Sequence, residues 1–218
     1  HDALPISEAE EGLSFGADNR TLVYASERDG NWQLYKAEIE RKEDLNFPNA
    51  TLIKEEVLLP SKTVERMYPK FSPDGKEVAF IEDRIRLKVL NLETNKVRQI
   101  TDGSTWYELS GGFNYAWSPD GKWFTLEFIG NKHDPYSDIG LVNAQGGDII
   151  NITNSGYTSG SPRWVLDGNA ILFITERAVL VLKDGRLILK RNILQSLRVG
   201  GKYNSSVSGY SLSERRFT

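Results

Sequence analysis

One turn motif recurs along this chain of 218 residues and limits the folds that it can adopt. The motif is clearest at 72–75, Ser-Pro-Asp-Gly, and three further copies share its pattern. An aromatic residue leads each copy, and these aromatics are 56, 46 and 47 residues apart: Phe15, Phe71, Trp117 and Trp164. Such a period is typical of architectures in which each repeat forms one supersecondary unit.

The motif has the chemistry of a tight hairpin turn. In 72–75, proline fixes φ at the second position of a type I turn, aspartate suits the third, and glycine adopts the left-handed conformation that follows. The turn itself requires these residue types, so a structural role is favoured over a catalytic or metal-binding one. The residues assigned to such turns are Asp18, Asn19, Pro73, Asp74, Gly75, Pro119, Asp120, Gly121, Asp167 and Gly168.

Each turn is followed by a short run of β-branched and aromatic residues, such as EVAFIE at 77–82. Runs that are apolar on both faces predict strands buried between two sheets. With two further runs and the strand before the turn, each copy has four strands, the size of a propeller blade. We therefore predict an all-β fold, a β-propeller of about three and a half four-stranded antiparallel blades that form an incomplete ring. The leading aromatics are expected in the core, and the blades at 13–60, 68–102, 114–154 and 161–190.

The two ends of the chain differ from the repeats. Residues 1–6, HDALPI, resemble the translation of a DNA-sequencing adapter, so we expect them to be non-native and the reading frame to start inside a longer gene. Residues 178–218 hold eight lysines or arginines and two acids, and a hairpin is predicted around Asp184-Gly185. For 191–218 a divergent strand pair, a truncated further blade and out-of-frame translation all stay open. A nucleic-acid-binding tail is disfavoured because the charges form no stripe.

Composition removes several classes of site. The chain has no cysteine, which excludes disulfides, thiolate metal sites and a cysteine nucleophile but fits cytoplasm and periplasm equally. The histidines are His1 and His133, and no Gly-x-Ser-x-Gly elbow occurs. His133, Asp134 and Asp138 make a weak metal-site pattern on a predicted loop. We expect no catalytic residue, no metal and no cofactor in this chain.

Topology indicates where binding would occur. Antiparallel strands alternate in direction, so the tight turns lie at one end of each sheet and the longer loops at the other. Long loops on a rigid scaffold commonly carry binding sites. For the loop aromatics, packing on their own strands is an equally open interpretation. The binding candidates at this end are Trp106, Tyr107, His133, Asp134, Tyr136 and Tyr157.

The motif also carries a family resemblance. SPDGK, led by an aromatic and followed by VAFIED or WFTLEFI, resembles the repeat of TolB-like propellers, tricorn-type serine peptidases and the propellers of prolyl-oligopeptidase relatives. That likeness covers about 13–177. The strings at 24–39 and 118–164 are most similar to the N-terminal propeller of bacterial tricorn-like peptidases.

The tricorn-like resemblance implies a non-catalytic propeller that gates or binds peptides for a serine-peptidase domain elsewhere in its parent. It implies peptides or unfolded polypeptides, a PDZ-like module, the peptidase domain and further copies in a homo-oligomer as partners. From the residues themselves we expect no nucleic acid, because the charges form no stripe, and no membrane span, because no apolar run approaches about 18 residues. The resemblance favours the periplasm or cell envelope of a bacterium, and the cytoplasm stays open. Two alternatives are a TolB-like envelope scaffold that binds a partner protein and the propeller of a prolyl-oligopeptidase relative.

Overall fold

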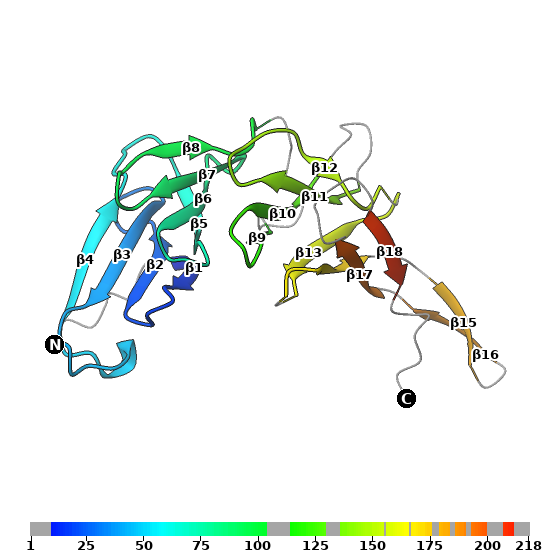
Figure 1. Cartoon of the computed structure of the whole chain (residues 1–218), viewed down its shortest axis with the longest axis horizontal. Helices are drawn as coiled ribbons and strands as arrows, with labels where there is room; N and C mark the ends of the chain where they lie inside the picture. The colour runs from blue at the N-terminus through cyan, green and yellow to red at the C-terminus, as the bar shows by residue number, and fades with distance from the viewer. Residues whose placement is uncertain are drawn as a thin grey trace. The chain divides into compact units, whose positions relative to one another are not determined.

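The structure is a computed structural model that describes residues 10–103, 114–129, 136–154, 156–165 and 167–175, and four later strands (Figure 1). For those later strands, between residues 179 and 211, the backbone course alone is described. The chain divides into two compact units, His1–Ser104 and Thr105–Thr218, which are considered separately. The described residues form strands and one 3-10 helix, η1 (Phe47–Asn49).

The first unit contains two four-stranded antiparallel sheets. The first sheet contains, in spatial order, β1 (Glu10–Phe15), β2 (Thr21–Ser26), β3 (Gln33–Ile39) and β4 (Ile53–Leu58). The second contains β5 (Arg66–Phe71), β6 (Glu77–Glu82), β7 (Arg86–Asn91) and β8 (Val97–Gln99). Strand β5 lies against β1, β2 and β3, so the two sheets pack face to face (Figure 1).

The second unit repeats this arrangement. The third sheet contains β9 (Tyr115–Trp117), β10 (Trp123–Phe128), β11 (Asp138–Asn143) and β12 (Ile150–Asn151). The fourth contains β13 (Ser159–Trp164), β14 (Ala170–Thr175), β17 (Ile193–Val199) and β18 (Val207–Ser211). Strand β13 lies against β9, β10 and β11, as β5 does against the first sheet.

The fourth sheet uses a different part of the chain from the expected range 161–190. Strands β15 (Val179–Lys183) and β16 (Arg186–Lys190) pair with each other as a separate two-stranded sheet, with the hairpin that the sequence predicts. Strand β14 pairs instead with β17, and β17 with β18. A hairpin satisfies its backbone hydrogen bonds locally, so the next extended segment is left to complete the sheet. Residues 193–211 thus supply a strand pair, whereas 1–6 lie outside the described residues.

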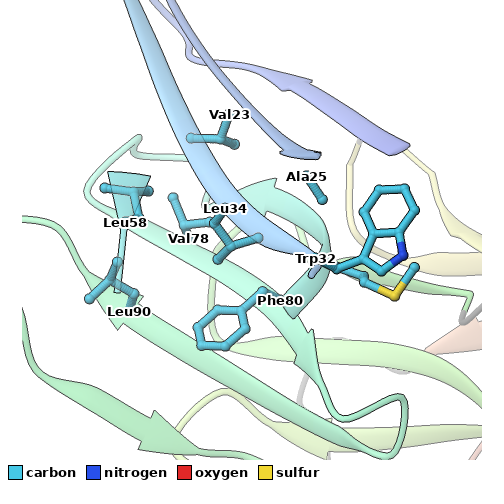
Figure 2. Packing of buried hydrophobic residues seen from close by; sticks show 9 residues of the cluster. Val23, Ala25, Trp32, Leu34, Leu58, Val78, Phe80 and Leu90 are labelled. Carbon is cyan, nitrogen blue, oxygen red and sulfur yellow. The ribbon is translucent and has the colours of Figure 1, made fainter. Parts of the chain in front are cut away.

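The core of the first unit lies between its two sheets (Figure 2). Val23 and Leu34 of the first sheet and Val78, Phe80 and Leu90 of the second are all fully buried. Residues 78–82 of β6 are buried without a break, so this strand is covered on both faces, as its apolar run predicts. Of the leading aromatics, Phe71, Trp117 and Trp164 are partly buried, whereas Phe15 is 55% exposed and the expectation of a core position is wrong for it.

The repeated turns are closed by one set of hydrogen bonds. At the start of β6, the Ser72 hydroxyl donates to Asp74 Oδ1 at 2.6 Å, and the Lys76 amide donates to the same oxygen at 3.1 Å. The Glu77 amide donates to Ser72 Oγ at 3.0 Å. Gly75 has a φ of 72°, a left-handed conformation that glycine adopts without steric cost. Pro73, between Ser72 and Asp74, is exposed.

The other three copies use the same geometry, unchanged in sequence at 118–121 and with substitutions in the first and fourth copies. Ser118 donates to Asp120 at 2.6 Å beside Pro119, and Gly121 has a φ of 69°. In the first copy, Asp18 accepts from the Thr21 amide and hydroxyl, and Asn19 takes the left-handed position with a φ of 55°. In the fourth, Asp167 accepts from the Asn169 amide at 3.2 Å, and Gly168 has a φ of 71°. A serine, where present, therefore adds two hydrogen bonds, one donated to the aspartate and one accepted from a backbone amide, to a turn that aspartate and a left-handed residue already define.

A β-bulge interrupts the first strand of three sheets, four residues before each turn. The pairing shifts between Glu11 and Ser14, between Met67 and Lys70, and between Gly160 and Arg163. The bulged residues have positive φ in each case: Gly12 at 68°, Tyr68 at 53° and Ser161 at 54°. A bulge increases the local twist of a strand, which suits one that lies across a neighbouring sheet.

The hydrogen bonds of the turn at 72–75 predict that the stability of the fold decreases at low pH. The pKa of Asp74 lies below its ordinary value of 3.8, chiefly because the Ser72 hydroxyl and then the Lys76 amide donate to the carboxylate. A carboxyl group with a lowered folded pKa stabilises the fold above its unfolded pKa, and this contribution is lost as the pH falls through the folded value. We expect Ser72→Ala to raise the pKa of Asp74 toward 3.8, measured by NMR titration of the side chain. Ser118→Ala is the matched control and should leave Asp74 unchanged; equal shifts in both variants would contradict the assignment.

Candidate binding site at the loop end of the sheets

The loop end of each sheet is the end opposite the Ser-Pro-Asp-Gly turns. In the first unit it is formed by the connections 27–32, 59–65 and 83–85. In the second unit it includes 136–137, before β11, and 152–158, between β12 and β13. Among the predicted binding residues, Trp106, Tyr107, His133 and Asp134 lie outside the described residues. Tyr136 and Tyr157 are described, with exposed fractions of 45% and 42%.

A pair of serines joins the backbone next to these two tyrosines. The Ser159 amide donates to the Ser137 carbonyl oxygen at 2.8 Å, and the Ser137 hydroxyl donates to the Ser159 carbonyl oxygen at 2.9 Å. Both serines are buried, Ser159 completely. Tyr136 directly precedes one serine, and Tyr157 lies two residues before the other. The two exposed tyrosines are therefore attached to one fixed junction between segments that are distant in the sequence.

Further polar contacts hold the strand ends behind this junction. The Asp138 carboxylate accepts from Asn151 Nδ2 at 2.8 Å and from the Thr153 hydroxyl at 2.6 Å. Thr153 Oγ1 in turn accepts from the Ile139 amide at 3.0 Å. The hydroxyl oxygens of Ser159 and Thr175 lie 3.2 Å apart. The ends of β11, β13 and β14 are thus fixed by side chains, which limits backbone movement beneath the tyrosines.

The exposed side chains of this arrangement have groups that suit the binding of a peptide. A tyrosine side chain combines an apolar ring with a hydroxyl group, a chemistry that suits peptide side chains and backbone amides. Ser137 and Ser159 themselves are buried. Within the described ranges no three His, Cys, Asp or Glu residues are grouped to hold a metal ion. Both carboxylate oxygens of Asp138, a candidate ligand in the sequence, already accept hydrogen bonds.

The first unit has a polar anchor at its loop end that the sequence analysis missed. Gln33 is 2% exposed, and its Oε1 accepts from the Ser61 amide at 2.9 Å. Its Nε2 donates to the carbonyl oxygens of Val64 at 3.0 Å and Trp32 at 2.7 Å. Gln33 therefore ties the connection 59–65 to the start of β3. Its signal in the sequence is a polar residue at the first position of a predicted strand.

A second missed group surrounds Arg28. Its guanidinium lies 3.7 Å from the centroid of the Tyr35 ring and 3.3 Å from the Glu55 carboxylate. The Tyr24 and Tyr35 rings stack 5.5 Å apart, and the Tyr35 hydroxyl donates to Asp29. Burial, together with the bond to Asp29, raises the pKa of Tyr35. These groups satisfy one another, so they stabilise the connection 27–32 rather than present an open ligand site.

In each unit, the first strand of the second sheet (β5 or β13) lies against the preceding four-stranded sheet. Four-stranded antiparallel sheets packed in this way are the blades of a β-propeller. The structure of TolB from Acinetobacter baumannii is similar, with a TM-score of 0.59 and 16% identity, over 94% of this chain and 44% of that chain. The tricorn protease has a TM-score of 0.59 and 13% identity, over 91% of this chain and 20% of that chain. An oligogalacturonate lyase from Vibrio parahaemolyticus has a TM-score of 0.60 and 16% identity, over 90% and 62%. These likenesses show the fold, a β-propeller of the TolB and tricorn kind.

Sequence comparison finds relatives named as peptidases. The peptidase YuxL of Bacillus subtilis is 25% identical over 117 residues, which is 48% of this chain and 16% of that protein. A protein of Sulfurisphaera tokodaii, whose name describes a tricorn-like protease C-terminal subunit, is 30% identical over 115 residues, or 52% of this chain and 12% of that protein. The chain thus matches a small part of each relative. No family model matches it.

No part of the chain that the structure describes forms a helix with the length and hydropathy needed to cross a bilayer.

Proposed function

We propose that this chain is the non-catalytic propeller of a tricorn-like serine peptidase, and that its loop end binds peptides for catalytic groups elsewhere in the parent protein. The two relatives named as peptidases and the tricorn-like fold support the class of parent. The role of this chain rests on one observation, the pair of exposed tyrosines attached to the Ser137–Ser159 junction.

The geometry of the junction favours an extended peptide as ligand. Tyr136 and Tyr157 belong to neighbouring segments whose backbones are hydrogen-bonded, so their rings are presented from a rigid base. Aromatic side chains supply a large contact area at a low entropic cost, because two torsion angles place the whole ring. Contacts with an aromatic ring tolerate many different peptide side chains. Such broad specificity is expected of a gate that admits varied peptides.

The remainder of the proposed assembly is what the tricorn-like resemblance implies. The PDZ-like module and the serine-peptidase domain would belong to the same parent, with homo-oligomers as a further level of organisation. The likeness to TolB supports placing the protein in the bacterial periplasm or cell envelope.

A TolB-like scaffold that binds a folded partner protein is the second candidate, because the TolB likeness extends over 94% of this chain. The two functions differ in the ligand. A peptide gate binds short unstructured peptides of varied sequence, whereas a scaffold requires a folded surface and does not bind such peptides.

The test is a binding titration with fluorescein-labelled peptides of about ten residues from digested casein, followed by anisotropy. We expect Tyr136→Ser and Tyr157→Ser each to weaken binding by about tenfold, since a lost aromatic contact is worth about 1–2 kcal/mol at an interface. Ile150→Ser is the matched control. Ile150 is 48% exposed in the same unit, but it follows the connection between β11 and β12, at the end of the sheet away from the two tyrosines. The peptide-gate function would be refuted if the peptides did not bind the unsubstituted chain, or if Ile150→Ser weakened binding as much as the tyrosine substitutions.

A further inference from the structure

One glutamate occupies a position of the repeat that is otherwise apolar. The residue ten positions after the leading aromatic of each copy is Ala25 in β2, Ile81 in β6, Glu127 in β10 and Ile174 in β14. Ala25 and Ile81 are completely buried, whereas Glu127 is partly buried. A carboxylate gains nothing from burial in an apolar position, so its presence there points to a role beyond packing.

The contact made at this position is changed as well. In the first unit, Ala25 belongs to the same buried cluster as Met67 of β5. Met67 and Gly160 each lie four residues before the leading aromatic of their copy, so Gly160 takes the place of Met67 in β13. A Cβ atom on Gly160 would lie 2.9 Å from Glu127 Oε2. An apolar pair of residues is thus replaced by a carboxylate that lies over a glycine.

This carboxylate lies next to the junction that carries the two exposed tyrosines. Glu127 pairs with Ile139, which follows Ser137 by two residues. On its other side the carboxylate lies beside Gly160, which directly follows Ser159. Because Ser137 and Ser159 are joined by hydrogen bonds, Glu127 belongs to the same loop end of the second unit as the candidate binding site.

The Glu127 carboxylate has no cationic partner within the described ranges. Two long hydrogen bonds end at its Oε2, from Asn114 Nδ2 at 3.3 Å and from the Ser161 amide at 3.4 Å, and no described residue donates to its Oε1. The partly buried Glu55 and Glu77 of the first unit, in contrast, each pair with an arginine. An ionised carboxyl group can accept about four hydrogen bonds, so Glu127 retains the capacity to bind an ammonium or guanidinium group.

We propose that Glu127 selects peptides with a lysine or arginine side chain for the site at Tyr136 and Tyr157, an inference that rests on the proposed peptide-binding function. The cationic head group of such a side chain pairs with the carboxylate. Its apolar stem suits contact with a tyrosine ring, and the cation itself is attracted to the ring face. Among the varied peptides that the tyrosines tolerate, basic peptides are then the favoured class.

A purely structural role is the alternative, in which Glu127 holds the β-bulge of β13 through the Ser161 amide. Glu127→Met separates the two roles, because it restores an apolar residue of similar length at this repeat position. Ser161 is exposed, so its amide can bond to water instead. We expect the thermal unfolding midpoint of Glu127→Met to stay within about 4 °C of the unsubstituted chain, the shift that a minor surface change produces.

The binding test compares two peptides that differ in charge. Both are about ten residues long, N-acetylated and labelled with an uncharged dye, and they carry lysine or Nε-acetyl-lysine at alternate positions between leucines. We expect anisotropy titrations to show about fivefold tighter binding of the lysine peptide, which corresponds to about 1 kcal/mol, because an ion pair at a partly exposed site has about this strength. About 0.5 M sodium chloride should remove most of the preference, since salt screens exposed charges.

Substitutions then assign the preference to one carboxylate. Glu127→Gln and Glu127→Met should each abolish it and leave the affinity for the acetyl-lysine peptide within about twofold. Asp148→Asn is the matched control. Asp148 is an exposed acid of the same unit, in the connection between β11 and β12 at the turn end, so this variant changes the net charge equally and should keep the preference.

Several outcomes would overturn the proposal. If the unsubstituted chain binds both peptides equally, or if Glu127→Gln keeps the preference, selection for basic peptides fails while the peptide-binding function stands. Equal loss of the preference in Asp148→Asn would make net charge its cause. A Glu127→Met chain that unfolds at a much lower temperature and still prefers lysine would assign the carboxylate to the bulge.

Two further results distinguish the remaining possibilities. A peptide with a free amino terminus and no lysine that binds as tightly as the lysine peptide would assign Glu127 to the terminal amine, and the proposal for a side chain would be wrong. If neither these peptides nor the casein peptides bind the unsubstituted chain, the proposed function and this inference are both refuted.

Discussion

Replacing Phe80 by alanine is expected to lower the free energy of unfolding of the first unit by about 3–5 kcal/mol, the usual cost of removing a fully buried phenylalanine. Phe80 is 0% exposed and belongs to the buried cluster between the first and second sheets (Figure 2). Its ring packs against a cluster that includes Val23, Leu34 and Leu90. The loss combines the transfer of the ring to water with the cavity that remains between two rigid sheets.

Urea unfolding followed by circular dichroism measures this effect. Leu45→Ala is the control, because Leu45 is 78% exposed and its truncation should change the unfolding free energy by about 0.5 kcal/mol or less. Similar costs for the two variants would mean that the interface between β2, β3, β6 and β7 does not form as described.

Gly140→Val should destabilise the second unit by about 2–3 kcal/mol, through overpacking rather than loss of contacts. A Cβ atom at Gly140 would lie 2.4 Å from Ile149 Cγ2 and 2.9 Å from Phe128 Cε1. Gly140 is buried in β11 and pairs with Leu126 on one side and Asn151 on the other, so neither backbone can retreat without breaking pairing. Glycine within a strand here marks a close approach of neighbouring side chains.

The control for this substitution separates steric overlap from backbone strain. Gly156 lies in the same unit with a φ of 67° and has no atom within 4 Å of an added Cβ. Gly156→Ala should therefore cost about 1 kcal/mol, from left-handed strain alone. Thermal unfolding monitored by circular dichroism compares the two variants, and a smaller loss for Gly140→Val than for Gly156→Ala would contradict the packing around β11.

Much of the fold could be predicted because it is specified by residues that lie close together in the sequence. The Ser-Pro-Asp-Gly turns join strands that are adjacent in the sequence, and Asp74 and Asp120 each bond to residues within two positions. Antiparallel neighbours then follow the chain order in the first three sheets. The fourth sheet departs from that order, because the β15–β16 hairpin is an equally local solution for the segment after β14.

The candidate binding site was predicted less completely. Two exposed loop tyrosines, Tyr136 and Tyr157, were named from the topology, but the Ser137–Ser159 junction that fixes their backbones joins residues 22 positions apart. Gln33 and Arg28 likewise act on partners more than 25 residues away, Ser61 and Glu55. Side-chain periodicity contains no information on such partners, because it reports which face is apolar and not what that face meets.

The sequence by itself determined the turns, the strands they join and the four-stranded repeat, since these depend on torsional preferences and on hydrogen bonds between near neighbours. Only the tertiary structure decided which sheet faces are covered, why Phe15 is exposed while Val78 and Phe80 are buried, and where Tyr68 and Ser161 adopt positive φ within their bulges. The physical reason is that burial and bulge geometry are set by a second sheet packed across the first, a contact between residues far apart in the chain.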